Sequence, residues 1–198
     1  GWFDNEELTG DAVTQITKGS TGDKTFYAKW TAIEYRITYN DLYGVTHSNP
    51  ATYNIESETI TFTPPTSTRT GYTFAGWNPT KIEKGSTDDK IVTAQWTINK
   101  YNITYTAPTH GTFTIQVGSN PAVNANTTAD YNTTITLANT PDRGYHFGSW
   151  DITPNVSINN NQTFSMPASN VTIGATFEPN TYTITWNPNG GTVAPTTS

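Results

Sequence analysis

The sequence predicts an all-β protein made of small tandem β-sheet units in an elongated array. The first observation is a recurring strand pattern, Tyr-x-Ile-Thr-aromatic, at residues 35–39, 101–105 and 182–186. A pattern that returns after 66 and then 81 residues indicates a repeat protein. The second observation is that Thr-rich alternating runs are separated by Asn, Gly and Pro, which is typical of strands and turns. The third is that no segment shows helical periodicity over the ~11 residues that a helix prediction requires.

Composition and charge narrow the classes of protein. Hydrophobic residues make up 33% of the 198 residues and aromatic residues 13%, so we expect small cores built from Trp, Tyr and Phe. The net charge of −6 disfavours nucleic acid as a partner, because phosphate binding needs a basic surface. No stretch approaches the ~20 apolar residues of a membrane span, so we expect no membrane insertion. The absence of cysteine excludes disulfides and cysteine-based metal sites.

Residues 1–31 read as the second half of a repeat. They begin with Gly-Trp-Phe, and their closing segment, 18–30, matches 84–96 at a constant offset of 66 residues. Alternation predicts a strand over 24–30 with Phe26, Ala28 and Trp30 on one face. Because the chain starts without Met in the middle of this pattern, and without a signal peptide, we expect it to be an excerpt or a processed piece.

Residues 32–97 form one complete repeat. Its predicted strands cover 35–39, 59–62 and the segment from Tyr72. Strict alternation would turn Trp77 outward, so either a β-bulge at Ala75–Gly76 turns it inward or the strand ends at Ala75. Both alternatives place Trp77 in the core. The best candidate for a single helical turn is Pro50–Ser57, and whether that turn forms stays open.

Residues 98–178 form a second complete repeat with altered spacing, and residues 179–198 open a further one. The last segment of the second repeat has Phe177 where the earlier repeats have Trp30 and Trp96. Residues 179–198 contribute an opening strand, 182–186, and a polar tail. The predicted strands of the second repeat include 101–105, 111–117, 132–137 and 156–158.

Tryptophan recurs at fixed repeat positions, which favours a place in the core over a binding role. Trp2, Trp77 and Trp150 share one position, whereas Trp30 and Trp96 share another. The sixth, Trp186, stands where other repeats have Tyr and is also predicted to be in the core. Single aromatics outside the repeat pattern are better candidates for an exposed binding surface, and these are Tyr27, Tyr43 and Tyr131.

Nothing in the sequence indicates catalysis, a cofactor or a metal. His47, His110 and His146 have no metal-binding spacing, and we expect them to be exposed. Paired acidic residues fall at turns or in different repeats, whereas a glycosidase needs two carboxylates facing each other across a cleft. The calcium-loop pattern is absent. The sequence therefore predicts a protein that is not an enzyme.

The ordered motifs of residues 32–97 resemble the Listeria–Bacteroides repeat, the internalin B-type B repeat of bacterial surface proteins. The resemblance rests on the opening Tyr-x-Ile-Thr-Tyr, the segment Arg69-Thr-Gly-Tyr-Thr-Phe-Ala-Gly-Trp77 and the closing Ala94-Gln-Trp96. Residues 98–178 resemble its divergent relative through Gly144-Tyr-His-Phe-Gly-Ser-Trp150 and Met166-Pro-Ala-Ser-Asn-Val-Thr172. The resemblance implies small β-grasp-like units in secreted or surface-anchored proteins and no activity. It offers no functional residue to carry over.

The function predicted from these observations is mechanical. We expect an extracellular stalk, spacer or adhesin shaft of a bacterial cell-surface or cell-wall protein, whose partners are the neighbouring repeats of the same chain. One alternative is a module that binds a glycan or a host surface protein through Tyr27, Tyr43 or Tyr131. Another alternative is a surface filament, in which the strand at 182–186 adds to residues 1–30 of another copy.

Overall fold

Fifteen strands, and no helix, occur in the part of the chain that the computed structural model describes, residues 1–187 and 189–191. The all-β prediction is therefore confirmed. The chain divides into two compact units. The first contains Gly1–Arg69 and Phe74–Thr97, and the second contains Thr70–Thr73 and the residues from Ile98 onward. Each unit is described by itself.

The first eight strands are β1 (Trp2–Phe3), β2 (Tyr27–Ala28), β3 (Tyr35–Asn40), β4 (Thr52–Tyr53), β5 (Ile60–Thr61), β6 (Tyr72–Asn78), β7 (Lys81–Ile82) and β8 (Lys90–Ile98). The other seven are β9 (Lys100–Tyr105), β10 (Gly111–Val117), β11 (Thr127–Asp130), β12 (Thr134–Pro141), β13 (Tyr145–Thr153), β14 (Thr163–Ser165) and β15 (Val171–Pro179).

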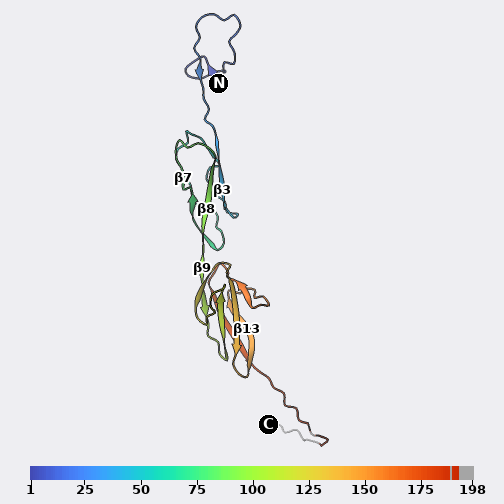
Figure 1. Cartoon of the computed structure of the whole chain (residues 1–198). Coiled ribbons are helices and arrows are strands. Elements are labelled where there is room, and N and C mark those ends of the chain that lie inside the picture. The colour runs from blue at the N-terminus through green and yellow to red at the C-terminus, as the bar shows by residue number, and fades with distance from the viewer. Residues whose placement is uncertain (188, 192–198) are drawn as a thin grey trace. The chain divides into compact units, whose positions relative to one another are not determined.

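In the first unit, a four-stranded sheet of order β4-β3-β8-β6 carries the core, together with the small β5-β7 pair (Figure 1). Alternation along β3 and β8 points Ile37 and Val92 to the same side, where both are buried. The buried members of this core are Ile37, Tyr53, Phe62, Trp77, Ile82, Val92 and Ala94. Aromatic rings fill most of it, as the low content of aliphatic residues predicts.

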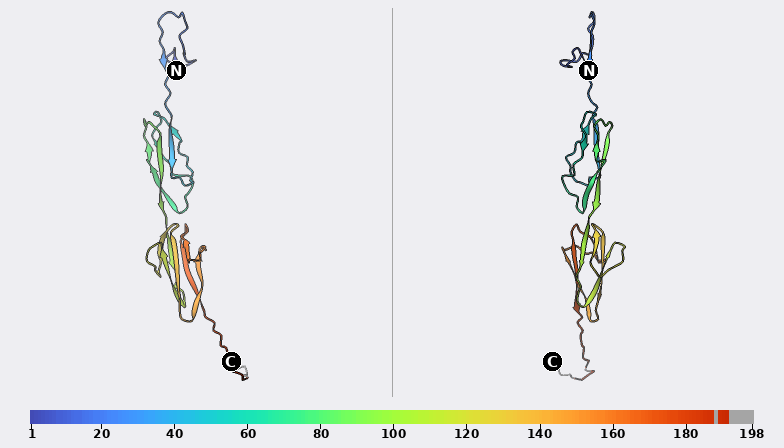
Figure 2. Two further views of the ribbon diagram at one scale, coloured as in Figure 1. Left: turned by 45° about the vertical axis from the view of Figure 1, so that its right-hand side comes forward. Right: turned by 90° about the vertical axis from the view of Figure 1, so that its left-hand side faces the viewer.

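In the second unit, two sheets share one core (Figure 2). The three-stranded sheet has the order β10-β12-β14 and the four-stranded sheet the order β11-β9-β15-β13. Their inward residues form a cluster in which Ile103, Ile115, Ile135 and Ile173 are completely buried. This core is larger and more aliphatic than that of the first unit.

Both complete repeats place their first and last strands side by side and parallel. In the first unit β3 pairs with β8, with Ile37 opposite Lys90 and Asn40 opposite Thr93. In the second, β9 pairs with β15, with Ile103 opposite Val171. Strands that run parallel begin at the same end of a sheet. The chain therefore enters each of these repeats at one end of its sheet and leaves at the other.

A β-bulge lies in the second unit at the place that corresponds to the bulge predicted at Ala75–Gly76, and in the first unit Trp77 has the inward position that this bulge was predicted to give. The pairing of β13 with β15 shifts register between Phe147 and Ser149. At the equivalent place in β6, Gly76 has a φ of 138°, and the strand continues to Asn78. Trp77 is consequently turned into the core and is 5% exposed. The alternative in which the strand stops at Ala75 is wrong.

Among the local elements considered, the helical turn that was left open is absent, and two predicted strands do not form. No helical turn forms within 50–57, because β4 is followed by a turn closed by the Ser57 N–H donating to the Asn54 carbonyl. Residues 156–158 are not a strand, although Val156 and Ile158 pack against the core. The predicted opening strand, 182–186, has no partner strand among the described residues and is not assigned as a strand. The polar tail predicted beyond it lies mostly in 192–198, outside the described residues.

Candidate functional site

The sheet of residues 1–30 leaves an apolar face uncovered. Only β1 and β2 form in this segment, which the structure describes completely, with Trp2 opposite Ala28 and Phe3 opposite Tyr27. Trp2 is 56% exposed and Trp30 is 89% exposed, and Ile16 is exposed as well. We call Trp2, Ile16 and Phe26 the open face.

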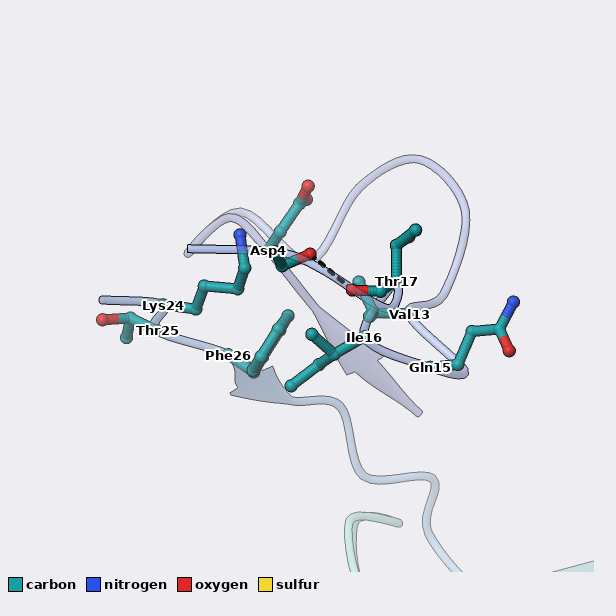
Figure 3. Close-up of a pocket in the computed structure, with 9 residues that line it drawn as sticks. Asp4, Val13, Gln15, Ile16, Thr17, Lys24, Thr25 and Phe26 are labelled. Atoms are coloured by element: carbon teal, nitrogen blue, oxygen red, sulfur yellow. Dashed lines mark hydrogen bonds between the residues drawn. The ribbon is translucent and has the colours of Figure 1, made fainter. Parts of the chain in front are cut away.

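Two adjoining pockets of about 350 and 390 Å³ lie at this face and share Val13, Gln15, Ile16 and Phe26. The first is the more polar and also includes Asp4 and Lys24. The second is mainly apolar and includes Trp2. In Figure 3 the side chains of Ile16 and Phe26 lie beside each other at the first pocket.

The segment between Trp2 and Lys18 brings part of this lining to the face. It is nine residues longer than its counterpart between Trp77 and Lys84. The Val13 N–H donates to the Trp2 carbonyl at 2.7 Å, which attaches the longer segment to β1. Reasoning from the repeat pattern missed Val13 and Ile16, and the extra length of this segment was the signal that could have revealed them.

The placement of tryptophan corrects the sequence prediction for half of these residues. Trp77 is buried, and Trp96 and Trp150 pack partly buried against the two cores. Trp2, Trp30 and Trp186 are exposed instead. The reason is that a position in a repeat predicts burial only when the strands that cover it are present. In the described residues, no strand corresponding to β3 covers Trp2 and Trp30, and no strand pairs with the segment that holds Trp186.

The three tyrosines proposed for an exposed surface have different surroundings. Tyr27 is half-buried in β2. Tyr43 is 64% exposed, and the guanidinium carbon of Arg69 lies 3.6 Å from its ring centroid and 5.4 Å from that of Trp96. Cation–π contacts of this kind fix both side chains. Tyr43 is therefore an exposed aromatic held in a defined orientation by Arg69.

Tyr131 is half-buried against Gly71 in the second unit. The two Tyr rings of this site, Tyr72 and Tyr131, meet edge to face at 6.0 Å. The Asn99 N–H donates to the Gly71 carbonyl at 2.9 Å, and the Tyr131 N–H donates to the Asn99 carbonyl. Gly71 has a φ of 76°, and a Cβ there would overlap the Tyr131 ring. Glycine is therefore favoured at position 71 both by the positive φ of the backbone and by the Tyr131 ring, which leaves no room for a Cβ.

The same backbone link occurs once more at the equivalent place. The Asn180 N–H donates to the Gly144 carbonyl at 2.8 Å. Gly144 has a φ of 90°, but space above it is open. The Asn–Gly link is thus a repeated feature, whereas the aromatic cover is found over Gly71.

One histidine corrects the prediction that all three are exposed. The loop after β3 folds back, so that the His47 ring packs 4.1 Å from the Tyr39 ring and 5.7 Å from that of Trp77. Its Nδ1 is buried and has no hydrogen-bond partner. His110 is exposed and stacks on Tyr145. No group of three or more metal-ligating side chains occurs within 1–187 and 189–191.

Two tyrosines of the first core have raised pKa values. Burial raises the pKa of Tyr39 to about 12, and its hydroxyl donates to the Pro50 carbonyl at 2.8 Å. Burial, and then the negative charge of Asp88, raise the pKa of Tyr53, whose hydroxyl donates to the Asp88 carbonyl at 2.6 Å. Both phenols are neutral donors that tie loops to the core.

Comparison with known proteins identifies the repeats. The Listeria–Bacteroides repeat domain matches residues 1–29 and 35–107, and the divergent InlB B-repeat domain matches 101–181. Such repeats are typically non-catalytic structural modules. Along the described residues, no helix is long and apolar enough to cross a membrane.

Two curated relatives come from Evansella cellulosilytica. One, named as a candidate Gly-rich membrane protein, is 29% identical over 147 residues, which are 62% of this chain and 16% of that protein. The other, named as a candidate membrane protein, is 28% identical over 113 residues, 53% of this chain and 16% of that protein. The matches span about a sixth of each relative. On the family matches, which together cover both complete repeats, the chain belongs to the Listeria–Bacteroides repeat family of bacterial surface proteins.

Proposed function

We propose that the chain is a non-enzymatic, extracellular spacer: a stalk or shaft segment that holds another part of a bacterial surface protein at a distance. The observation that carries this proposal is the parallel pairing of the first and last strands in each complete repeat. The chain leaves a repeat at the opposite end from where it enters. Each repeat therefore adds to the distance between the segment that precedes it and the segment that follows it.

The advance per repeat follows from the strand registers. Ile98 lies eight residues beyond Lys90, the partner of Ile37, and Tyr35 lies two residues before Ile37. Ten residues of strand correspond to about 33 Å at the usual rise per residue. The same reasoning from Lys100 to Pro179 gives about 36 Å for the second repeat. If the chain instead left the repeat at the end where it entered, the repeat would add almost nothing to the distance between the segments on either side of it.

The test is to lengthen the chain and measure its reach. One, two and three extra copies of residues 35–100 would be inserted after Lys100, and the maximum dimension measured by small-angle X-ray scattering. We expect a linear increase of at least about 30 Å for each copy. The matched control inserts Gly/Ser linkers of equal length, whose dimension grows only as the square root of length. Square-root growth for the repeats would contradict a spacer.

The binding-module alternative has one supporting observation, the exposed Tyr43 ring braced by Arg69. A screen of the folded protein against glycans and host cells, with Tyr43→Ala and Tyr131→Ala as variants, tests it. Binding that the Tyr43 variant alone loses would make this repeat a binding module. A blank screen leaves the spacer as the proposed function.

A further inference from the structure

The outward face of the four-stranded sheet in the second repeat carries amide and hydroxyl side chains on three neighbouring strands. The pattern Asn-x-Thr falls in or at the start of each of them, at 102–104 in β9, 126–128 in β11 and 170–172 in β15. Thr128 lies opposite Asn102, and Thr172 lies opposite Thr104. Neighbouring strands are about 4.8 Å apart, so these side chains form one continuous polar surface.

A hollow of about 330 Å³ lies at this surface. Its lining is uncharged and consists of Asn102, Ile103, Thr104, Asn126, Thr127 and Thr128. Asn126 is held in place because its Oδ1 accepts a hydrogen bond from the Tyr105 N–H at 2.8 Å. With that oxygen engaged, the amide of Asn126 presents its N–H donors, whereas the exposed hydroxyls of Thr104 and Thr128 can both donate and accept.

Comparison with the first repeat shows that the fold does not require these residue types. Its sheet has the same topology, and the strand registers place Arg36 and Ile91 where the second repeat has Asn102 and Thr172. Arg36 is exposed, and Ile91 is 63% exposed. The same sheet therefore forms with a charged and an apolar side chain on this face, so the neutral polar face is a property of the second repeat alone among the two.

One member of the pattern has a structural role in both repeats. The Asn102 N–H donates to Asn170 Oδ1 at 2.9 Å, and at the equivalent place the Arg36 N–H donates to Asp89 Oδ1 at 2.7 Å. Asn170 thus satisfies a backbone donor of β9, and we leave it out of the site.

We propose that the hollow at Asn102, Thr104, Asn126 and Thr128 binds a neutral saccharide. Sugar hydroxyls donate and accept hydrogen bonds, and the lining offers partners of both kinds. An anionic ligand would meet no cation in the lining, and the charged residues of β9 and β11, Lys100 and Asp130, pair with each other at 2.8 Å. An apolar ligand would bury these polar groups without hydrogen bonds.

The size of the hollow suits a short stretch of a saccharide chain, because 330 Å³ is at the lower end of the range for ligand sites. Exposed hydrogen bonds are individually weak, so we expect binding to be strongest where many sugars are presented together. The inference goes beyond the spacer function and does not depend on it, because a spacer can act with or without a ligand.

An array of oligosaccharides printed at high density tests the proposal with the whole chain. The neutral probes are oligomers of glucose, mannose and N-acetylglucosamine, and oligomers of uronic acids are the charged comparison. We expect binding to at least one neutral series and none to the uronic acids. The absence of binding to every neutral series, or equal binding to the uronic acids, overturns the proposal.

Two substitutions locate the binding face. Thr104→Val keeps the shape of the side chain and removes its hydroxyl, and Asn102→Arg introduces the residue that the first repeat carries at this place. Each should raise the half-saturating protein concentration by about threefold to tenfold. The matched controls, Thr38→Val and Arg36→Asn, change the equivalent exposed positions of the first repeat and should leave binding unchanged. Circular dichroism verifies that all four variants are folded. Equal losses in the variants and their controls, or no loss in either variant, overturn the assignment of the site.

Discussion

Residues 1–30 and residues 67–97 carry the same sequence pattern but have opposite exposures. Trp2 and Trp77 both follow a glycine, and Trp30 and Trp96 both end the closing segment. Yet Trp77 is buried and Trp96 packs partly buried against the core, whereas Trp2 and Trp30 are exposed. The difference lies in what covers them. In the complete repeat β3 extends the sheet beside β8, and Tyr53 and Phe62 pack in the same core as Trp77, whereas residues 1–30 have no such neighbours in the described structure.

The comparison teaches that a repeat position sets which way a side chain points and not whether it is buried. Direction comes from local alternation along the strand, which is present in both segments. Burial comes from non-local partners, which only the complete repeat brings together. Substituting a buried residue and the exposed residue at the same repeat position therefore separates the effect of side-chain direction from the effect of burial.

The largest expected effect is at the shared tryptophan position. Trp77→Ala should lower the free energy of unfolding of the first repeat by about 3–5 kcal/mol, because it removes a ring from the centre of an aromatic core. Trp2→Ala should change it by less than about 0.5 kcal/mol, as for exposed residues generally. Urea unfolding followed by circular dichroism measures both. Similar losses for the two variants would show that the open face is covered in solution.

The next effect is at the central isoleucine of the first strand. Ile103→Ala should destabilise the second unit by about 2–5 kcal/mol, because Ile103 is at the centre of its core. Ile184→Ala, at the equivalent position, should have almost no effect in dilute solution. Thermal unfolding at two protein concentrations measures the difference. Equal losses for the two variants would contradict the difference in burial between Ile103 and Ile184.

A smaller effect is expected at the glycine that immediately precedes β6 and β13. Gly71→Ala and Gly144→Ala both place a side chain at positive φ, which costs about 1 kcal/mol. Gly71→Ala also drives a Cβ into the ring of Tyr131, whereas Gly144 faces open space. We therefore expect Gly71→Ala to cost about 1–3 kcal/mol more. Tyr131→Ala in the same chain should remove that excess, and an unchanged excess would mean that the ring is not its source.

The smallest effect concerns pH. The unfolded chain ionises its tyrosines near pH 10, but burial raises the pKa of Tyr39 to about 12 in the folded protein. The stability of the first repeat should therefore be complete below pH 10 and fall between pH 10 and about 12. Tyr39→Phe should reduce this fall while losing the hydrogen bond to the Pro50 carbonyl. Unfolding midpoints measured across this pH range, with the phenolate absorbance as a monitor, provide the comparison.

The architecture was predictable because repeats and alternation are local signals. The first strands β3 and β9, the inward Trp77 and the all-β fold follow from spacing and from the glycines near the bulge. The parallel pairing of the first and last strands could not be predicted from the residues, because it joins segments more than fifty residues apart. The sequence of each strand does not specify which other strand it pairs with.

The candidate site was less predictable for a related reason. Exposure of Trp2 and Trp186 depends on which covering strands are present, and the contribution of Ile16 depends on an extra segment with no counterpart in the other repeats. His47 was expected in water because it lies in a polar loop. Two residues in the left-handed region, Asp41 and Tyr43, accompany the turn of that loop, which brings the His47 ring onto Tyr39.

The parallel pair at the centre of each repeat has a mechanical consequence. Tension applied through the neighbouring segments pulls β3 and β8 in opposite directions along their own length, because the chain is attached at opposite ends of the two strands. The hydrogen bonds between these strands are roughly perpendicular to the applied force, so they must break at the same time. The β5–β7 pair, pulled apart from one end, would open one bond after another. Pulling a complete repeat at its two ends would therefore load the pairing of β3 with β8 in shear.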